Sequence, residues 1–411
     1  MKIYLVGGSI RDRLLGFPVH DRDWVVVGST PEKMLQKKYQ QVGRDFPVFI
    51  HPITHEEYAL ARTEKKNGVG YSGFLFDFSP HITLKDDLIR RDLTINSMAQ
   101  DNFGNIIDFF NGKSDLKKRV LRHVSSSFQE DPLRVLRVAR FAAQLSHLGF
   151  YIAKKTLFLM KLICNRKELL YLTPERVWNE TKKGLCSPSP HVYFQVLHSC
   201  NALIYLFPEI NFFYKQAFVY HFFMNKDNFL RYSLIELSRI SKITNKLDIR
   251  FAYFLQFMSQ MYSISIINIK NYFFYEQPVL LIKSLCKRLK VPRETEKITI
   301  FLCGFHNFLQ TIASQSSELI VNFFNIIDVW RKPGRLNKLI YLNFYYSNNL
   351  TNLKKNITLG NLLKSMFLVI NSITINSFIN KNLFHGVEIK NELYRLRVNA
   401  LNVWRNKLFN K

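Results

Sequence analysis

Hydrophobic positions follow two patterns along the chain, and the change between them falls near residue 130. Up to about residue 112, short apolar runs alternate with turn residues, and most of the glycines lie there. These runs predict strands at residues 2–6, 23–27, 48–51 and 58–62. Short helices are expected at residues 9–15 and 31–38, and Ser29 or Thr30 is positioned to cap the second.

The part of the chain after Asp131 has the period of α-helices. Apolar residues recur mainly three or four positions apart, as at Leu133, Leu136 and Phe141. No repeat of fixed period and no linker rich in Pro, Ser or Gly divides this part. In the first part, residues 64–73 are rich in Gly and Lys without an apolar period, which predicts a mobile loop. The pattern as a whole predicts an α+β head followed by helices.

Charge narrows the choice of partners. The 411 residues include 58 Lys and Arg against 31 Asp and Glu, a formal net charge of +27. This surplus indicates a polyanionic partner, either nucleic acid or an anionic membrane surface, although roughly a third of it is attributable to the bias towards Lys, Asn and Ile in the second half. The basic residues do not gather on one amphipathic segment, which disfavours a membrane surface. The longest uncharged run, residues 251–269, contains several polar residues and therefore favours a buried helix over a membrane span.

The cysteines and the N-terminal residues indicate the cellular compartment in which the protein acts. Five cysteines lie far apart without a Cys-x-x-Cys pair, a spacing that suits neither a disulfide framework nor a zinc site. The apolar run before Arg11 is too short for a signal-peptide core. We therefore expect a cytoplasmic protein in a reducing environment.

The opening of the chain carries the first group of residues with a chemical use. Gly7 and Gly8 lack Cβ, so the backbone can turn tightly and approach a phosphate, and Arg11 on the following helix adds a positive fork. Asp21 and Asp23 are two residues apart at an expected strand, so both carboxylates face one side. Such oxygen ligands suit Mg²⁺. The Asp pair alone is a weak signal, but joined to Gly-Gly-x-x-Arg it predicts a magnesium-dependent phosphate site.

A second group of residues lies at a predicted helix start. Asp131 is expected to be the N-cap and Pro132 the first helical residue. Arg134, Arg137 and Arg140 then recur every third residue and sweep about 120° of one helix side. Because these like charges repel one another, a solvated surface or an anion must offset them.

These residues belong to three motifs that resemble those of the class II tRNA nucleotidyltransferases and bacterial poly(A) polymerases. Residues 7–12 with 21–24 match the first motif, residues 90–96 the second and residues 130–141 the third. The motifs occur in order, and the similarity continues through residues 172–178 before it thins out. Within this superfamily the chain is similar to the CCA-adding enzymes of the gamma-proteobacterial type.

The resemblance implies a fold and an activity. A nucleotidyltransferase head, like the polymerase-β palm with a mixed sheet, is expected at residues 1–115. An all-helical neck with a base-selecting helix is expected at 116–200, a helical body at 201–330 and a helical tail at 331–411. The implied activity is template-independent addition of C, C and A to the 3′ end of tRNA from CTP and ATP. The acceptor arm of tRNA would be gripped by shape and phosphate contacts, and the protein is expected to be a monomer or a weak homodimer.

The resemblance also assigns roles to single residues. Asp21 and Asp23 would be catalytic and hold Mg²⁺, and Asn96 would serve a backbone or ribose contact. Asp131 and Arg134 would form a protein template that hydrogen-bonds the base edge of CTP and then of ATP, and residues 64–73 resemble the loop that helps the family change from C to A. The residues expected to bind the nucleotide are Gly8, Arg11, Arg91, Asp131, Arg134, Arg137 and Arg140.

The chain departs from the resemblance in the body. Gamma-proteobacterial relatives often carry a metal-dependent phosphohydrolase there, marked by a His-Asp pair and further histidines. After residue 200 the histidines of this chain are His221, His306 and His385, and no His-Asp dipeptide occurs. We therefore expect the helical scaffold without the hydrolase chemistry, and His306 as a packed or surface residue. Two alternatives remain for the whole chain: a poly(A) polymerase or CC-only enzyme with the same head, and a non-catalytic RNA-binding relative.

Overall fold

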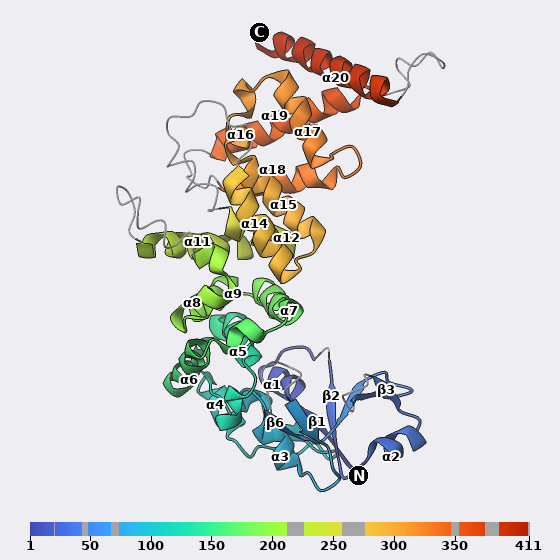
Figure 1. Cartoon of the computed structure of the whole chain (residues 1–411), viewed down its shortest axis with the longest axis vertical. Helices are drawn as coiled ribbons and strands as arrows, with labels where there is room; N and C mark the ends of the chain where they lie inside the picture. Colours follow the sequence, from blue (N-terminus) through green and yellow to red (C-terminus); the bar gives the residue numbers. More distant parts are fainter. Residues whose placement is uncertain are drawn as a thin grey trace. The chain divides into compact units, whose positions relative to one another are not determined.

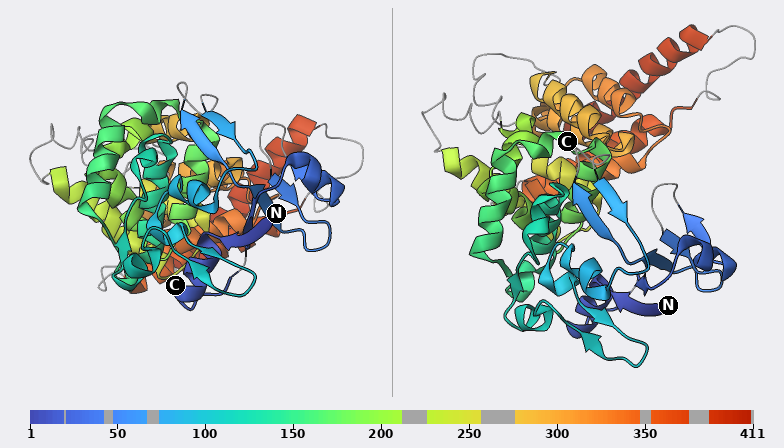
Figure 2. Two further views of the ribbon diagram at one scale, coloured as in Figure 1. Left: turned by 90° about the horizontal axis from the view of Figure 1, so that it is seen from below. Right: turned by 60° about the horizontal axis from the view of Figure 1, so that its bottom comes forward.

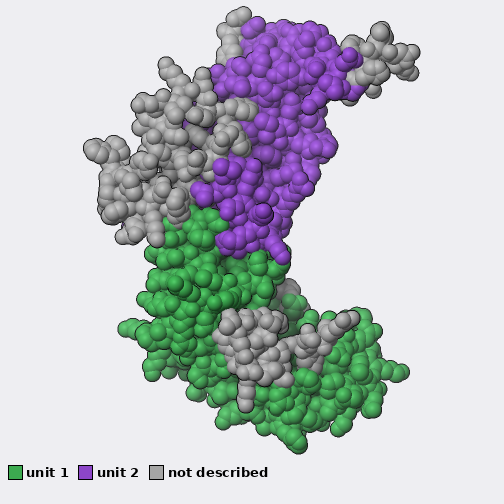
Figure 3. Space-filling model, viewed as in Figure 1, with its two compact units in different colours: residues 1–211 green, residues 212–411 purple. Residues whose placement is uncertain are grey.

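The structure described here is a computed structural model of the whole chain. It describes residues 1–19, 21–42, 48–66, 74–211, 226–256, 276–346, 353–374 and 386–409. These residues form two compact units, Met1–Asn211 and Phe212–Lys411, which Figure 3 shows in green and purple. Each unit is described by itself.

A mixed sheet opens the first unit. Among the described residues it has seven strands in the order β3-β4-β5-β2-β1-β8-β9, in which β2 and β5 run parallel and the other neighbours antiparallel. The strands are β1 (Lys2–Val6), β2 (Asp23–Val27), β3 (Gln40–Val42), β4 (Val48–Ile50), β5 (Glu57–Leu60), β8 (Ala99–Gln100) and β9 (Ile106–Ile107). The predicted α+β head with a mixed sheet is confirmed.

Alternation along β2 gives the sheet two apolar faces. Val25 packs with Leu84 and Leu88 of α3 (Leu84–Ile89) on one face. Val26 packs with Met34 of α2 (Pro31–Gln36) on the other face, since successive side chains of a strand point to opposite sides. Asp23 therefore shares the face of Val25 and α3. The Thr30 hydroxyl accepts a hydrogen bond from Lys33 N, so of the two predicted caps of α2 it is Thr30 that forms one.

The prediction of a loop at residues 64–73 is partly wrong. Residues 63–66 form β6 (Thr63–Lys66), which pairs antiparallel with β7 (Phe74–Asp77) in a separate two-stranded ribbon. Figure 2 shows this ribbon standing apart from the larger sheet. Residues 67–73 of the predicted loop lie outside the described residues.

The rest of the first unit is mostly helical (Figure 1). The neck expected at 116–200 is not all-helical, because β10 (Val120–Leu121) and β11 (Tyr151–Ile152) pair there in parallel. The helices are α4 (Gly112–Lys117), α5 (Leu133–Leu145), α6 (Lys154–Asn165), α7 (Pro174–Leu185), α8 (Pro190–Ser199) and α9 (Ala202–Leu206), and α1 (Gly8–Leu14) lies at the start of the chain. The apolar residues Leu133, Leu136 and Phe141 are buried, as their period predicts. The helix α5 begins at Leu133, one residue later than predicted, because Pro132 is its N-cap; the Asp131 carboxylate still accepts a hydrogen bond from Leu133 N at 3.0 Å.

The second unit is helical wherever it is described, in agreement with the prediction. Its helices are α11 (Lys226–Ser241), α12 (Leu247–Leu255), α14 (Glu276–Leu289), α15 (Arg293–Gly304), α16 (His306–Gln310), α17 (Ser317–Ile327), α18 (Gly334–Tyr346), α19 (Leu353–Asn371) and α20 (Gly386–Phe409). Burial lowers the pKa of His306 to about 4, so this histidine is a packed residue. Most of the run 251–269 lies outside the described residues. Within the described part of the chain, no helix combines the length and the apolar character that crossing a bilayer requires.

Candidate active site

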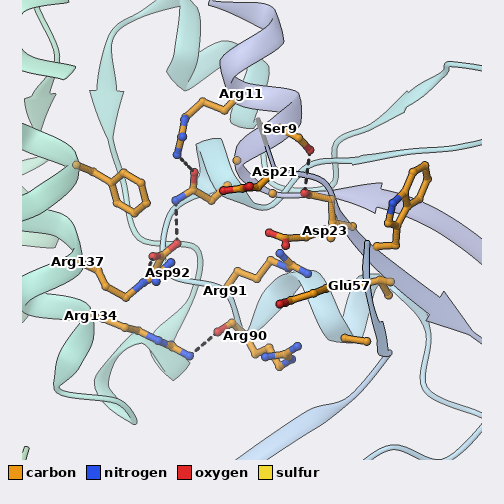
Figure 4. Close-up of a pocket in the computed structure, with 18 of the residues that line it drawn as sticks. Ser9, Arg11, Asp21, Asp23, Glu57, Arg90, Arg91, Asp92, Arg134 and Arg137 are labelled. Carbon is orange, nitrogen blue, oxygen red and sulfur yellow. Dashed lines mark hydrogen bonds and ion pairs between the residues drawn. The ribbon is translucent and has the colours of Figure 1, made fainter. Parts of the chain in front are cut away.

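A pocket of about 700 Å³ lies in the first unit between the sheet, α1, α5 and α7. Figure 4 shows charged side chains from the sheet, α1 and α5 converging on it. Every residue that the sequence singled out for catalysis or nucleotide binding lines this pocket: Gly8, Arg11, Asp21, Asp23, Arg91, Asp131, Arg134, Arg137 and Arg140. Residues from three separated motifs therefore face one cavity.

The Gly-Gly turn and Arg11 form one wall of the pocket. Gly7 has a φ of 77°, a left-handed conformation that favours glycine, and a Cβ on it would lie 3.2 Å from Arg91 Nη1. Arg11 is 4% exposed and its guanidinium donates to both carboxylate oxygens of Asp12, at 2.8 and 2.9 Å. Its Nη1 also donates to Asn96 Oδ1 at 2.6 Å. Arg11 is thus a fixed positive group with a set orientation rather than a free surface arginine.

The two predicted catalytic carboxylates, Asp21 and Asp23, both point into the pocket (Figure 4). Asp23 is the first residue of β2 and lies opposite Val6, whereas Asp21 precedes the strand. Both are exposed. Burial of part of the Asp23 carboxylate raises its pKa; Asp21 adds to the rise, and Arg91 and Arg137 oppose it. Asp23 therefore binds a proton more readily than an ordinary aspartate until a cation compensates its charge.

Glu57 is a third carboxylate of this wall that the sequence did not reveal. The parallel register of β2 and β5 sets Glu57 beside Asp23, and the side chain lines the same pocket (Figure 4). The only sequence signal for it would have been the pairing of these two strands, and a parallel register cannot be read from two short apolar runs.

Arg91 is held by a buried acid. Asp87 of α3 is fully buried, and its carboxylate accepts a 2.9 Å hydrogen bond from Arg91 Nη2 and another from Arg90. Although burial raises the pKa of Asp87, the two arginines outweigh it and lower the pKa to about 2. Arg90 also donates to Glu64 Oε1 of β6 at 2.5 Å. Asp87 and Glu64 were not predicted, and together they orient the arginine pair of the second motif.

The next residue of the second motif, Asp92, connects the head to α5. Its Oδ2 accepts from Arg137 Nε at 2.6 Å, and its Oδ1 accepts from Asn96 Nδ2 at 3.1 Å. Because Asn96 also accepts from Arg11, a continuous chain of hydrogen bonds runs from Arg11 to Arg137. The Asn96 side chain contacts those of Arg11 and Asp92, and its expected backbone or ribose contact stays a prediction.

The charges of the three arginines on α5 are offset by the protein itself. Arg137 pairs with Asp92, and Arg140 Nε donates to Glu180 Oε2 of α7 at 2.6 Å. Arg134 is 6% exposed and donates to the main-chain carbonyls of Ser127 and Arg90, at 2.6 and 2.5 Å. Burial lowers the pKa of Arg134 and Arg140, while the Asp92 carboxylate raises that of Arg137. Side-chain carboxylates of the same unit therefore offset Arg137 and Arg140, whereas main-chain carbonyls hold Arg134.

Asp131 lies two residues before the first residue of α5, and its side chain contacts α7. Its Oδ2 accepts from Arg176 Nη2 at 2.8 Å, and Arg176 lines the pocket as well. Arg176 lies within residues 172–178, the last part of the resemblance, and Glu180 lies just after it; neither was predicted as a site residue. Their signal is a spacing of four residues on one helix, which places both side chains towards α5.

The donor chemistry of the pocket fits Mg²⁺. This ion binds proteins through one or two carboxylates and completes its shell with water and substrate phosphates. Asp21 and Asp23 provide two such carboxylates next to a cavity rich in arginine. In the described part of the chain no three His, Cys, Asp or Glu side chains gather as an ion site, so the remaining ligands would come from phosphate and water.

Two family models match the chain. Residues 3–122 match the poly A polymerase head domain, and residues 149–213 match the probable RNA and SrmB- binding site of polymerase A. The CCA-adding enzyme of Buchnera aphidicola subsp. Cinara cedri (strain Cc) is 66% identical over 409 residues, which cover 99% of this chain and 99% of the relative. The chain belongs to the CCA-adding enzyme family. The CCA-adding enzyme of Buchnera aphidicola subsp. Schizaphis graminum (strain Sg) is 50% identical over 411 residues, covering 99% of this chain and 98% of the relative.

Solved structures support the fold of a CCA-adding enzyme. The Bacillus stearothermophilus CCA-adding enzyme in complex with CTP has a TM-score of 0.64 and 21% identity, covering 97% of this chain and 88% of the other. A tRNA nucleotidyltransferase complexed with a primer tRNA and an incoming ATP analog has a TM-score of 0.56 and 22% identity, with 89% and 96% covered. The resemblance stated from the motifs and the predicted fold class are both confirmed.

Proposed function

We propose that this chain adds C, C and A to the 3′ end of tRNA from CTP and ATP, without a nucleic acid template, and releases pyrophosphate. One observation carries the proposal: Asp21 and Asp23 line the same pocket as Asp131 and Arg134. A nucleotide in this pocket can therefore meet carboxylates at its triphosphate and a paired acceptor and donor at its base. The CCA-adding enzymes at 66% and 50% identity support this reading.

At the triphosphate end, fixed positive groups bind and orient the nucleotide. Arg11 and Arg91 are anchored by Asp12 and Asp87, so each keeps remaining N–H donors for phosphate oxygens without losing side-chain entropy at binding. Asp21 and Asp23 would hold Mg²⁺, which would lower the pKa of the attacking 3′-hydroxyl and neutralise the leaving pyrophosphate. The 3′-hydroxyl of tRNA would lose its proton to water, and its oxygen would form a bond to the α-phosphorus as the bond from that phosphorus to pyrophosphate breaks.

At the base end, Asp131 and Arg134 would read the base edge. Cytosine and adenine both present an exocyclic amine, from which a carboxylate can accept a hydrogen bond. Uracil and guanine present a carbonyl oxygen at the same position, which cannot donate one. A carboxylate has about four acceptor positions, and Asp131 uses one on each oxygen within the protein. Arg134 gives two donors to main-chain carbonyls out of the five that a guanidinium offers, which leaves donors for a ring nitrogen or carbonyl. The remaining nucleotide contacts would come from Gly8, Arg137 and Arg140.

The finer assignments belong to the same proposal. We propose action in the cytoplasm with Mg²⁺, as a monomer or a weak homodimer, and recognition of the tRNA acceptor arm by the helical part of the chain. The domain limits at residues 115, 200 and 330 remain a proposal. A phosphohydrolase activity is expected to be absent, because His-Asp dipeptides do not occur after residue 200. With added Ni²⁺, release of phosphate from 2′,3′-cyclic nucleotides should then stay at background.

The test is an analysis of the added nucleotides. Purified protein is incubated with tRNA that lacks its 3′ end, Mg²⁺ and labelled CTP and ATP, and the products are sequenced. Stepwise addition of two C and one A is expected. Unlimited addition of A would indicate a poly(A) polymerase, addition that stops after two C a CC-only enzyme, and no addition with retained tRNA binding a non-catalytic RNA-binding protein.

A further inference from the structure

Arg176 connects the base-reading carboxylate to a second helix. Its Nη2 lies 2.8 Å from Asp131 Oδ2, and the two side chains are 24% and 19% exposed. Both line the pocket, so the contact lies at the cavity wall. Two charged groups that are mostly shielded from water interact more strongly than an exposed pair and in a better defined geometry.

A second hydrogen bond, from Arg176, fixes the orientation of the Asp131 carboxylate. Leu133 N donates to Asp131 Oδ1 at 3.0 Å, which leaves the carboxylate free to turn about that single contact. The bond from Arg176 to the other oxygen removes this freedom and sets the plane of the carboxylate. A group that must accept from an amine and reject a carbonyl oxygen needs such a fixed direction.

The same helix also contacts the middle of α5. Glu180 lies one turn after Arg176 on α7 and accepts from Arg140 Nε at 2.6 Å. Glu180 is 5% exposed, so this is a buried partner. Helix α7 thus contacts a charged residue before α5 and another on its second turn, and these two contacts set the helix as a rigid body.

We propose that Arg176 is a positioning residue that determines nucleotide specificity: it holds Asp131 in the orientation in which the carboxylate accepts from the exocyclic amine of cytosine or adenine. The proposal rests on the base-reading role proposed above for Asp131. Without Arg176 the Asp131 carboxylate can turn away, and a water can then bridge it to the O4 carbonyl of uracil. Selection of CTP over UTP is therefore expected to relax, while tRNA binding and folding are retained.

The experiment compares kcat/KM for CTP and for UTP at the first added position of tRNA lacking its 3′ end. The variants are Arg176→Gln, Arg176→Lys, Asp131→Ala and the double variant Asp131→Ala with Arg176→Gln, all as the full chain. Arg166→Gln is the matched control, since it removes an arginine charge from the same unit at an exposed position whose carboxylate partner, Glu168, lies 4.0 Å away. Thermal midpoints and tRNA KM values are recorded for each variant.

We expect Arg176→Gln to lower the CTP-to-UTP ratio about tenfold or more, mainly through kcat for CTP. Arg176→Lys, which keeps the charge but not the fork, is expected to be intermediate, and Arg166→Gln to keep the ratio of the unchanged protein. In the Asp131→Ala background, Arg176→Gln should change the ratio by less than about twofold, because a residue that acts through another has no further effect once that residue is gone.

Three results would overturn the proposal, each in a different way. If Arg176→Gln keeps the ratio while Asp131→Ala loses it, Arg176 has no part in selection and the proposed function stands. If Arg176→Gln lowers the ratio equally in both backgrounds, Arg176 contacts the base itself. If Asp131→Ala keeps the ratio, the base-reading role in the proposed function fails, and the role of Arg176 fails with it.

Discussion

Arg137 Nε lies 2.6 Å from Asp92 Oδ2, and this ion pair joins helix α5 to the second motif of the head. The Asp92 side chain is 4% exposed and that of Arg137 is 36% exposed. Although burial raises the pKa of Asp92, Arg137 and the hydrogen bond from Asn96 outweigh it and lower the pKa well below its usual range. The contact of α5 with the head therefore depends on one buried carboxylate of the head.

Asp92→Asn is expected to destabilise the first unit. The change keeps the volume but leaves Arg137 without its counter-charge, and breaking a fully buried pair costs about 3–5 kcal/mol. Since about a third of the Arg137 side chain is exposed, we expect roughly 2–4 kcal/mol, measured as the free energy of unfolding in urea. Glu392→Gln, which breaks an exposed pair with Arg395 on α20, is the control and should have no measurable effect. Equal stability of Asp92→Asn and the unchanged protein would refute the structural role of the pair.

The low pKa of Asp87 predicts how the free energy of unfolding depends on pH. Its pKa in the folded protein is about 2, below the ordinary 3.8, so it stabilises the fold fully above about pH 4. This contribution, roughly 2 kcal/mol, is lost as the pH falls from about 4 to about 2. Asp87→Asn cannot titrate, so its free energy of unfolding should fall less over this window than that of the unchanged protein. Two parallel curves of stability against pH would contradict the assignment.

Asp21→Asn and Asp23→Asn should each abolish incorporation while tRNA retention stays nearly intact. Loss of a carboxylate that holds Mg²⁺ removes several kcal/mol of transition-state stabilisation, a fall of roughly 10²–10³-fold in kcat. Labelled CTP incorporation and filter binding of tRNA measure the two quantities separately. Glu32→Gln, at an exposed position of α2 in the same head, is the control and should keep its activity. Near-normal incorporation by either aspartate variant would exclude that residue from catalysis.

Gly112 predicts a steric effect close to the site. A Cβ at this position would lie 2.4 Å from the main-chain oxygen of Thr94 in the turn that carries Asn96. We expect Gly112→Ala to cost about 1–3 kcal/mol of stability and to lower activity, because Asn96 moves with the turn. Gly334→Ala is the matched control, since no atom lies within 4 Å of its Cβ, and it should be neutral or stabilising by up to ~1 kcal/mol. The thermal midpoints of unfolding of the two variants are compared. Equal midpoints would contradict the close approach of a Cβ at residue 112 to the main-chain oxygen of Thr94.

The motifs predicted charged groups that line the pocket, but not the groups that hold them. Asp21, Arg91 and Arg134 could be found because a short stretch of sequence carries both the residue type and its spacing. Glu180 could not, because its contact with Arg140 spans 40 residues and depends on how α7 packs on α5. For the same reason, the sequence indicates that the charges of Arg134, Arg137 and Arg140 must be offset, but it does not show which groups offset them.

The errors in the fold have a similar physical origin. The loop predicted at residues 64–73 was wrong for residues 64–66, because a Lys-rich segment lacks the alternation of a half-buried strand. These residues belong to β6, which pairs with residues 74–77 in a ribbon outside the main sheet. The strands β8 and β9 are two residues long, too short for any alternation to appear. Pro132 and the apolar period after it predicted the start of α5 to within one residue.

The most direct test of the central claim is a structure of the protein with CTP and Mg²⁺. One bound CTP should span the pocket of the first unit, with its triphosphate beside Asp21 and Asp23 and its base edge facing Asp131 and Arg134. A CTP whose base points away from Asp131 and Arg134, or which binds outside this pocket, would contradict the account.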